Sequence, residues 1–128
     1  MSFLLDTHVL LWWLFDDNRL SKRARSLAED PSNKVFVSSV SAWEISTKHR
    51  LGKLESAATL VQDIAGWVQK AGFVGLPITL AHAQRAGSWL QEHRDPFDRM
   101  LAAQSAIENL PLVSRDPAFE AFAISVVW

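Results

Sequence analysis

The chain has 128 residues, of which 48% are apolar and 21% are charged, and its formal net charge is −1. This length suits a single domain over residues 1–128, the apolar content excludes a disordered chain, and the balanced charge excludes a simple basic nucleic-acid binder. Because there is no cysteine, disulfides, thiolate metal sites and a cysteine nucleophile are excluded too, which is compatible with a reducing cytoplasm.

The apolar start of the chain, MSFLLDTHVLLWWLF, raises the question of a signal peptide or a membrane span. It has no basic start and no small-residue cleavage site, and Asp6 and His8 interrupt it. The run that ends before Asp16 is also too short to cross a bilayer. We therefore predict a buried strand followed by a helix, and no membrane partner.

Strands and helices are predicted to alternate along the chain. In order, we predict a strand at Phe3–Asp6, helices at Thr7–Phe15 and Leu20–Glu29, a strand at Val35–Ser38, helices at Val40–Leu51 and Leu60–Lys70, a strand at Phe73–Ile78, helices at Leu80–Gln91 and Pro96–Glu108, and strands at Leu112–Ser114 and Ile124–Trp128. This order indicates βαβ units and a three-layer α/β/α sandwich with a central, mostly parallel sheet.

Four acidic residues fall where such a sheet brings distant segments together. Asp6 ends the first strand and Asp116 follows the fourth, while Glu44 and Asp98 lie in the first turns of helices that begin at the same edge. Converging carboxylates repel by about 4 kcal/mol per pair at an effective dielectric of ~20. Mg²⁺ or Mn²⁺ removes that cost. The pattern favours a metal-dependent site for phosphate chemistry.

Asp6 and Asp116 also have an ordinary structural interpretation as helix caps. Asp6 precedes the helix that begins at Thr7, and Asp116 stands before a proline, a common start for a helical turn. Both roles are compatible, because a cap at a strand's carboxyl end faces the cleft. Thr7 could donate a hydrogen bond to a metal-bound water or phosphate, and Ser114 could orient either.

The other two acids have equally ordinary alternatives. Glu44 could pair at the surface with Lys48, four residues on, or Lys48 could reach a substrate phosphate from the same face. Asp95 suits a cap, and Asp98 at the third helical position suits the helix dipole. We favour Asp98 as the ligand and Asp95 as cap or outer-shell support. Arg99 could bind a phosphate or neutralise these acids.

The net charge and the tryptophans bear on whether the chain binds nucleic acid or a second subunit. Without the four proposed ligands the chain has 13 basic and 10 acidic residues, a net +3, which could accept RNA or DNA or be ordinary surface charge. The six tryptophans are predicted to be mostly core, but Trp12 and Trp13 are adjacent. One helix does not easily bury both, so we hypothesise that one lies in a subunit interface.

Several segments together resemble the PIN-domain family, and more narrowly the VapC-like toxins of bacterial type II toxin–antitoxin systems. They are LLDTHVLLWWL, SSVSAWEISTKHRLGKL, HRDPFDRMLAAQSAIENLPLVSRDPAF and VVW, and the resemblance is most specific at DPFDRMLAAQ. It implies a parallel α/β/α fold, a Mg²⁺- or Mn²⁺-dependent ribonuclease, a dimer, and inhibition by a small antitoxin. The family's acids match Asp6, Glu44, Asp98 and Asp116, and its small hydroxyl residue matches Thr7.

The mechanism implied by the resemblance is hydrolysis of an RNA phosphodiester. Asp6 and Asp98 would mainly hold one metal, which activates a water, and a second metal, if present, would stabilise the leaving oxygen. Glu44 and Asp116 would complete or orient the shell, partly through waters. The implied candidates for phosphate contacts are Arg99, Lys48 and Arg50.

Three other functions compete with the nuclease interpretation of this sequence. An aspartate-nucleophile phosphatase needs a second acid two residues after the nucleophile, where this chain has His8. A phosphoacceptor receiver domain needs an acidic pair at the end of the first strand, where this chain has one acid. A catalytically silent binding or scaffold module stays open, although all four acids are present.

Overall fold

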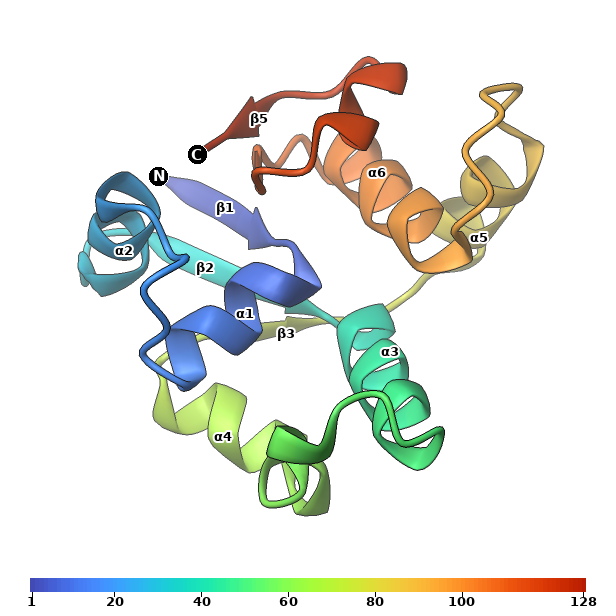
Figure 1. Ribbon diagram of the computed structural model, residues 1–128. Coiled ribbons are helices and arrows are strands. Elements are labelled where there is room, and N and C mark those ends of the chain that lie inside the picture. The colour runs from blue at the N-terminus through green and yellow to red at the C-terminus, as the bar shows by residue number, and fades with distance from the viewer.

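The computed structural model describes residues 1–128 and places a parallel sheet between two layers of helices, which confirms the predicted fold class (Figure 1). The strands are β1 (Ser2–Leu5), β2 (Lys34–Ser38), β3 (Val74–Leu76), β4 (Leu112–Val113) and β5 (Val126–Val127), in the order β3-β2-β1-β4-β5. The helices are α1 (Thr7–Leu14), α2 (Lys22–Glu29), α3 (Ser39–Arg50), α4 (Ile64–Lys70), α5 (Leu80–Ser88) and α6 (Pro96–Glu108), with 3₁₀ turns at Glu55–Ala57, Leu60–Gln62 and Pro117–Ala121. None of the helices has the length and apolar character needed to span a bilayer.

Neighbouring residues of β1 pack into different layers. Phe3 and Leu5 belong to a core shared with α1, α2 and α4, whereas Leu4 belongs to a core shared with α6. Successive side chains of a strand point to opposite faces. A strand covered on both sides is therefore apolar throughout, which is why the start of the chain is so hydrophobic.

The strand register brings the ends of β1 and β4 together. Leu5 pairs with Val113, and the Asp6 N–H donates to the Val113 carbonyl at 3.0 Å. The residues that follow these two strands, Asp6 and Ser114, consequently emerge at the same carboxyl edge. On the other side of β1, strand β2 ends at Ser38 and leads directly into α3.

The predicted helix at Leu60–Lys70 is wrong, because Asp63 divides it. Asp63 is extended, with φ −158° and ψ 71°, and separates a 3₁₀ turn from α4. Its carboxylate accepts a hydrogen bond from the Gly66 N–H at 3.0 Å and so caps α4. The apolar periodicity continues across the break, which explains why the sequence pattern did not reveal it.

The predicted helix at Leu80–Gln91 ends three residues early, at Ser88. Arg99 from α6 donates to the backbone carbonyls of Trp89 and Gln91, and also to those of Ala86 and His93. These bonds hold the segment after Ser88 in a non-helical path. A tertiary contact therefore sets this boundary.

The tryptophans are less buried than predicted, and the two adjacent ones are both accommodated within the chain. Trp12 is 7% exposed and is the only buried tryptophan, whereas Trp43 is 59% exposed. Trp13 packs against Phe73 with ring centroids 5.8 Å apart. Trp13 is nevertheless partly exposed, so the hypothesis that one of the two lies in a subunit interface stays a prediction.

Candidate functional site

Asp6 is a buried carboxylate at the end of β1. It occupies the N-cap position of α1, but its side chain makes no capping hydrogen bond. Instead, its Oδ2 accepts a hydrogen bond from the Ser114 hydroxyl at 2.8 Å. Burial raises the pKa of Asp6, the bond from Ser114 opposes this, and the charge of Glu44 adds to the rise. Since the carboxylate does not cap the helix, capping does not explain its burial.

Asp98 lies in the first turn of α6, where Asp95 takes the capping role. The Asp95 carboxylate accepts from the N–H groups of Phe97 at 2.8 Å and Asp98 at 3.3 Å, which confirms it as the cap. The Asp98 Oδ2 lies 2.9 Å from the Nε2 of His93. Burial raises the pKa of Asp98 to about 6; the His93 bond opposes this, while the charges of Asp95 and Asp6 add to it.

Glu44 lies one turn into α3, and its side chain is only 4% exposed. Its Oε2 forms an ion pair with the Lys48 ammonium, so the pair that the sequence offered as one alternative is present, but the Glu44 end of it is buried and not at the surface. Burial alone would lower the pKa of Lys48, yet the bond to Glu44 and the charges of Glu44, Asp95 and Asp98 raise it. Lys48 is therefore stabilised in its charged form by acids at the starts of both α3 and α6.

Asp6, Asp116 and Glu44 open into two pockets that share His8, whereas Asp98 lines neither of them. Asp6 and Asp116 line a pocket of about 380 Å³, and Glu44 and Lys48 line one of about 280 Å³; His8 lines both. Asp116 is exposed, and its Oδ1 accepts from the Ala118 N–H at 2.9 Å. The predicted cap at Asp116 is thus confirmed, and its side chain remains at the mouth of the Asp6 pocket.

The two hydroxyl groups predicted to contact phosphate are buried and engaged by the protein. The Thr7 hydroxyl is hydrogen-bonded to the Ser41 hydroxyl at 2.9 Å. The Ser114 hydroxyl donates to Asp6 and accepts from the Asp116 N–H at 3.1 Å. The structure does not support either as a phosphate contact. Ser114 instead orients the Asp6 carboxylate.

The predicted phosphate-binding cations differ in what their environment permits. Arg99 gives four of its five N–H donors to backbone carbonyls, so the structure does not support it as a phosphate ligand or as a partner of the acids. Arg50 lies six residues after Glu44, about 240° around the helix, on a different face of α3. Lys48 alone faces the acids.

The two buried acids and the half-buried Asp98 have the donor chemistry that a hard divalent cation requires. Asp6, Asp98 and Glu44 each commit one carboxylate oxygen to a protein partner, which leaves the second oxygen for another ligand. No three His, Asp or Glu side chains are grouped closely enough to form a ready-made metal site. Mg²⁺ commonly binds through one or two carboxylates and several waters, so the residues fit such an ion without a complete protein shell.

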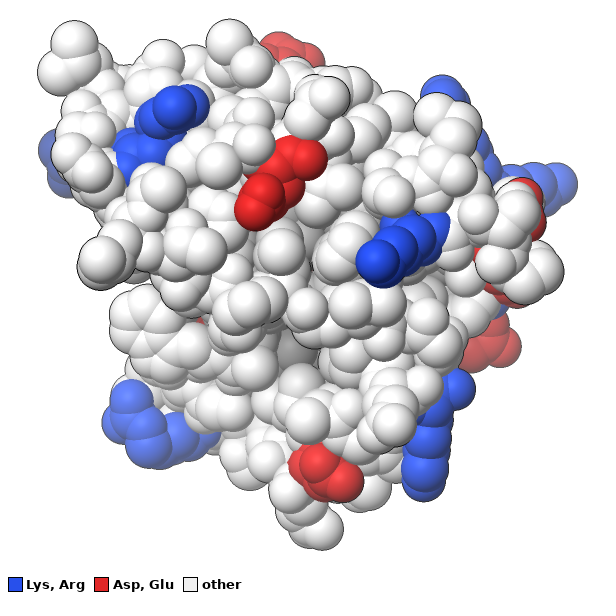
Figure 2. All heavy atoms as spheres, turned by 180° about the vertical axis from the view of Figure 1, so that it is seen from behind, with Lys and Arg blue, Asp and Glu red and all other residues white.

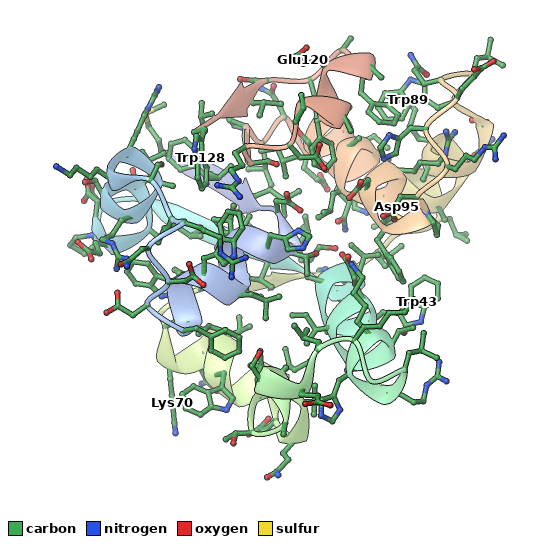
Figure 3. The ribbon with its side chains drawn as sticks, viewed as in Figure 1. Trp43, Lys70, Trp89, Asp95, Glu120 and Trp128 are labelled. Carbon is green, nitrogen blue, oxygen red and sulfur yellow. The ribbon has the colours of Figure 1, made fainter.

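His93 is a site residue that the sequence did not reveal. Its ring lies 6.5 Å from the Phe119 ring and 5.6 Å from the Phe122 ring, centre to centre, and its side chain is 17% exposed. Packing against these rings turns its Nε2 toward Asp98. Figure 3 shows Asp95, two residues after His93, at the end of α6 nearest α3. The HRDPFD segment placed His93 near the acids, but its orientation depends on tertiary contacts.

Comparison with known proteins places this site in a known fold. A model of the PIN domain matches residues 3–125. VapBC2 from Rickettsia felis, bound to a promoter DNA fragment, is similar with a TM-score of 0.70 and 16% identity over 99% of this chain and 98% of that one. FitAcB from Neisseria gonorrhoeae gives 0.66 and 21% over 100% and 97%, and a toxin–antitoxin complex from Klebsiella pneumoniae gives 0.63 and 22% over 99% and 97%. At these identities the likeness concerns the fold alone. No curated protein sequence matches the chain.

Proposed function

The chain belongs to the PIN-domain family, and we propose that it is a metal-dependent endoribonuclease, the toxin of a bacterial type II toxin–antitoxin module. In this role it hydrolyses RNA phosphodiester bonds and so restrains translation or growth. The observation that carries the proposal is the arrangement of two buried acids, Asp6 and Glu44, and the half-buried Asp98, in which the charge of Glu44 acts on Asp6 and the charge of Asp6 acts on Asp98. Three nearby carboxylates repel one another and so lower the stability of the fold. A bound cation would relieve that repulsion, which makes a cation-dependent reaction the simplest explanation for the arrangement.

Asp6 and Asp98 are the proposed direct ligands of Mg²⁺ or Mn²⁺, with Glu44 and Asp116 acting through waters. When bound, the ion activates a water and neutralises charge on the phosphoryl group. Ser114 and His93 fix the orientations of Asp6 and Asp98, as residues around metal ligands commonly do. Lys48 holds Glu44 and is the cation best placed to meet the scissile phosphate.

The proposed partners follow from the same role. The similar structures include toxin–antitoxin complexes, which supports a cognate antitoxin for this chain. We also propose an RNA substrate, a homodimer and a cytoplasmic location, with the whole chain acting as one domain.

One observation favours the alternative of a catalytically silent binding or scaffold module. The acids do not form a ready-made metal group, and each already has a protein partner. A silent module would need only the fold and its surface. Its effect in cells would survive neutralisation of Asp6 and Asp98, whereas the effect of a nuclease would not.

The decisive experiment is cleavage of total RNA by the purified protein, free of antitoxin, with Mg²⁺, with Mn²⁺ and with a chelator. Discrete fragments that need metal and disappear in Asp6→Asn are the expected result. Asp30→Asn is the matched control, because it makes the same chemical change at an exposed acid that bonds only to Ser32. Full activity in a folded Asp6→Asn protein would overturn the proposal.

A further inference from the structure

Two arginines lie against one tryptophan in the pocket that contains Asp6 and Asp116. The guanidinium carbon of Arg115 is 4.6 Å from the centre of the Trp12 ring, and that of Arg19 is 5.2 Å from it. Both arginines line the pocket. An indole face attracts guanidinium groups, and because Trp12 is buried, its ring is a fixed surface for them. Trp128, labelled in Figure 3, packs edge-on against Trp12 at 5.8 Å and supports it.

The two arginines differ in their partners. Arg19 makes a two-point contact with Asp17, Nη2 to Oδ2 at 2.7 Å and Nε to Oδ1 at 3.1 Å. Arg115 is exposed and makes no side-chain hydrogen bond or ion pair with the protein. Two cations held by one ring repel each other. Asp17 hydrogen-bonds only to Arg19, although its charge also acts on Arg115. The guanidinium of Arg115 therefore keeps its N–H donors free of protein acceptors at the pocket.

The pocket thus combines an acidic floor with a basic rim. Asp6 lies at its buried end, and Arg115 lies beside Asp116 at its exposed end. A guanidinium binds a phosphate through two parallel hydrogen bonds. On the face shown in Figure 2, by contrast, the Lys and Arg side chains stand apart, with uncharged residues and some Asp and Glu side chains between them, so no continuous basic stripe forms there. The Arg115 rim is a local basic feature beside the candidate catalytic acids.

We infer that Arg115 forms a phosphate subsite for the RNA substrate and binds a backbone phosphate next to the one that is cleaved. Arg19, fixed by Asp17, supports this subsite and shapes its rim. Arg115 is a positioning residue, since it holds the strand over the acids and takes no part in bond cleavage. The inference rests on the proposed nuclease function, which supplies the reason for a nucleic-acid strand to cross this pocket.

The test is binding of a short, fluorescent single-stranded RNA, followed by anisotropy at several salt concentrations. Asp98→Asn is the parent protein, with Mg²⁺ present, so that binding is measured without cleavage. Adding Arg115→Gln should weaken binding about fivefold at low salt and reduce the slope of log affinity against log salt by about 0.7, the effect of one lost phosphate contact. Arg115→Lys should keep the slope, because it keeps the charge.

Arg85→Gln is the matched control. Arg85 is also an exposed arginine that lies on a tryptophan, 5.8 Å from the ring centre of Trp89, but it is outside the pocket. It should leave affinity and slope unchanged. Equal losses from Arg85→Gln and Arg115→Gln, or no loss from Arg115→Gln, would overturn the subsite while leaving the nuclease proposal standing. A parent protein that does not bind RNA at all would overturn both the subsite and the nuclease proposal. RNA binding that depends on Arg115, in a protein whose wild type never cleaves RNA, would overturn only the nuclease proposal.

Discussion

Replacing Asp98 by asparagine should make the metal-free protein more stable near neutral pH. The wild-type carboxyl has a pKa of about 6 in the folded chain, against an ordinary value of 3.8, first because it is buried and then because Asp95 and Asp6 lie nearby. A carboxyl whose pKa rises on folding is harder to ionise when folded than when unfolded. Its negative charge therefore opposes folding, and the amide removes that charge at almost constant shape.

The magnitude follows from the shift of about two pKa units. At about 1.4 kcal/mol per unit, ionised Asp98 costs the folded state up to about 3 kcal/mol. The side chain is 16% exposed, so water screens part of this cost. We therefore expect Asp98→Asn to raise the free energy of unfolding by about 1–2 kcal/mol near pH 7.

The pH dependence gives the sign of the effect. Below about pH 3 the carboxyl is protonated in both states, so wild type and variant should be equally stable. The difference should grow as the pH rises from about 4 through about 6 and become constant above about pH 7, where the carboxyl is ionised in both states. Urea unfolding at several pH values, with a chelator present, measures this directly.

The control for this series is Asp30→Asn, whose effect should have the opposite sign. The pKa of Asp30 is lowered by its bonds to Ser32, so this variant should lose a little stability at neutral pH and none in acid. Added Mg²⁺ should stabilise the wild type more than Asp98→Asn. An Asp98→Asn protein that is no more stable than wild type at neutral pH would refute the electrostatic argument for the site.

Two further substitutions separate orienting residues from structural ones. Ser114→Ala removes the donor to Asp6 and should lower kcat/KM for RNA cleavage at least about tenfold. Urea unfolding should show that the free energy of unfolding falls by only about 1 kcal/mol. An unchanged kcat/KM would contradict the role given to Ser114. A lysine at position 99 cannot reproduce the four carbonyl contacts, so Arg99→Lys should lower the free energy of unfolding by about 2–3 kcal/mol. The rate of RNA cleavage per folded molecule should be unchanged. A raised KM in an equally stable protein would instead make Arg99 a phosphate contact.

The fold was predictable because its strongest signals are local. Apolar runs, helix caps and the order of elements were enough to predict the parallel α/β/α sandwich, and Pro96–Glu108 has the predicted bounds. The errors arose where a single side chain overrides periodicity. Asp63 interrupts an apolar pattern because it is the N-cap of α4. Arg99 ends α5 because it binds backbone carbonyls of the segment that follows that helix. Such contacts leave no regular spacing in the sequence.

The positions of the acids in the fold were predictable, but the partners of the acids were not. Strand ends and helix starts predicted that Asp6, Glu44 and Asp98 lie near one edge of the sheet, because topology alone brings those positions there; their role as a site stays a prediction. The hydrogen-bond partners Ser114 and His93 depend on side-chain orientation, which register and aromatic packing determine. The hydroxyl of Ser114 was accordingly predicted to face the ligand, whereas it faces Asp6.

The hydrogen-bond and ion-pair partners of the acids stabilise these side chains in the protein before any ligand binds. Glu44 has a full cation, Lys48, whereas Asp6 has only a hydroxyl and Asp98 a histidine. Asp6 and Asp98 are thus the two acids of this set that have no permanent cation. An added positive charge is the partner they lack, which is the physical reason for proposing them, rather than Glu44, as the direct metal ligands.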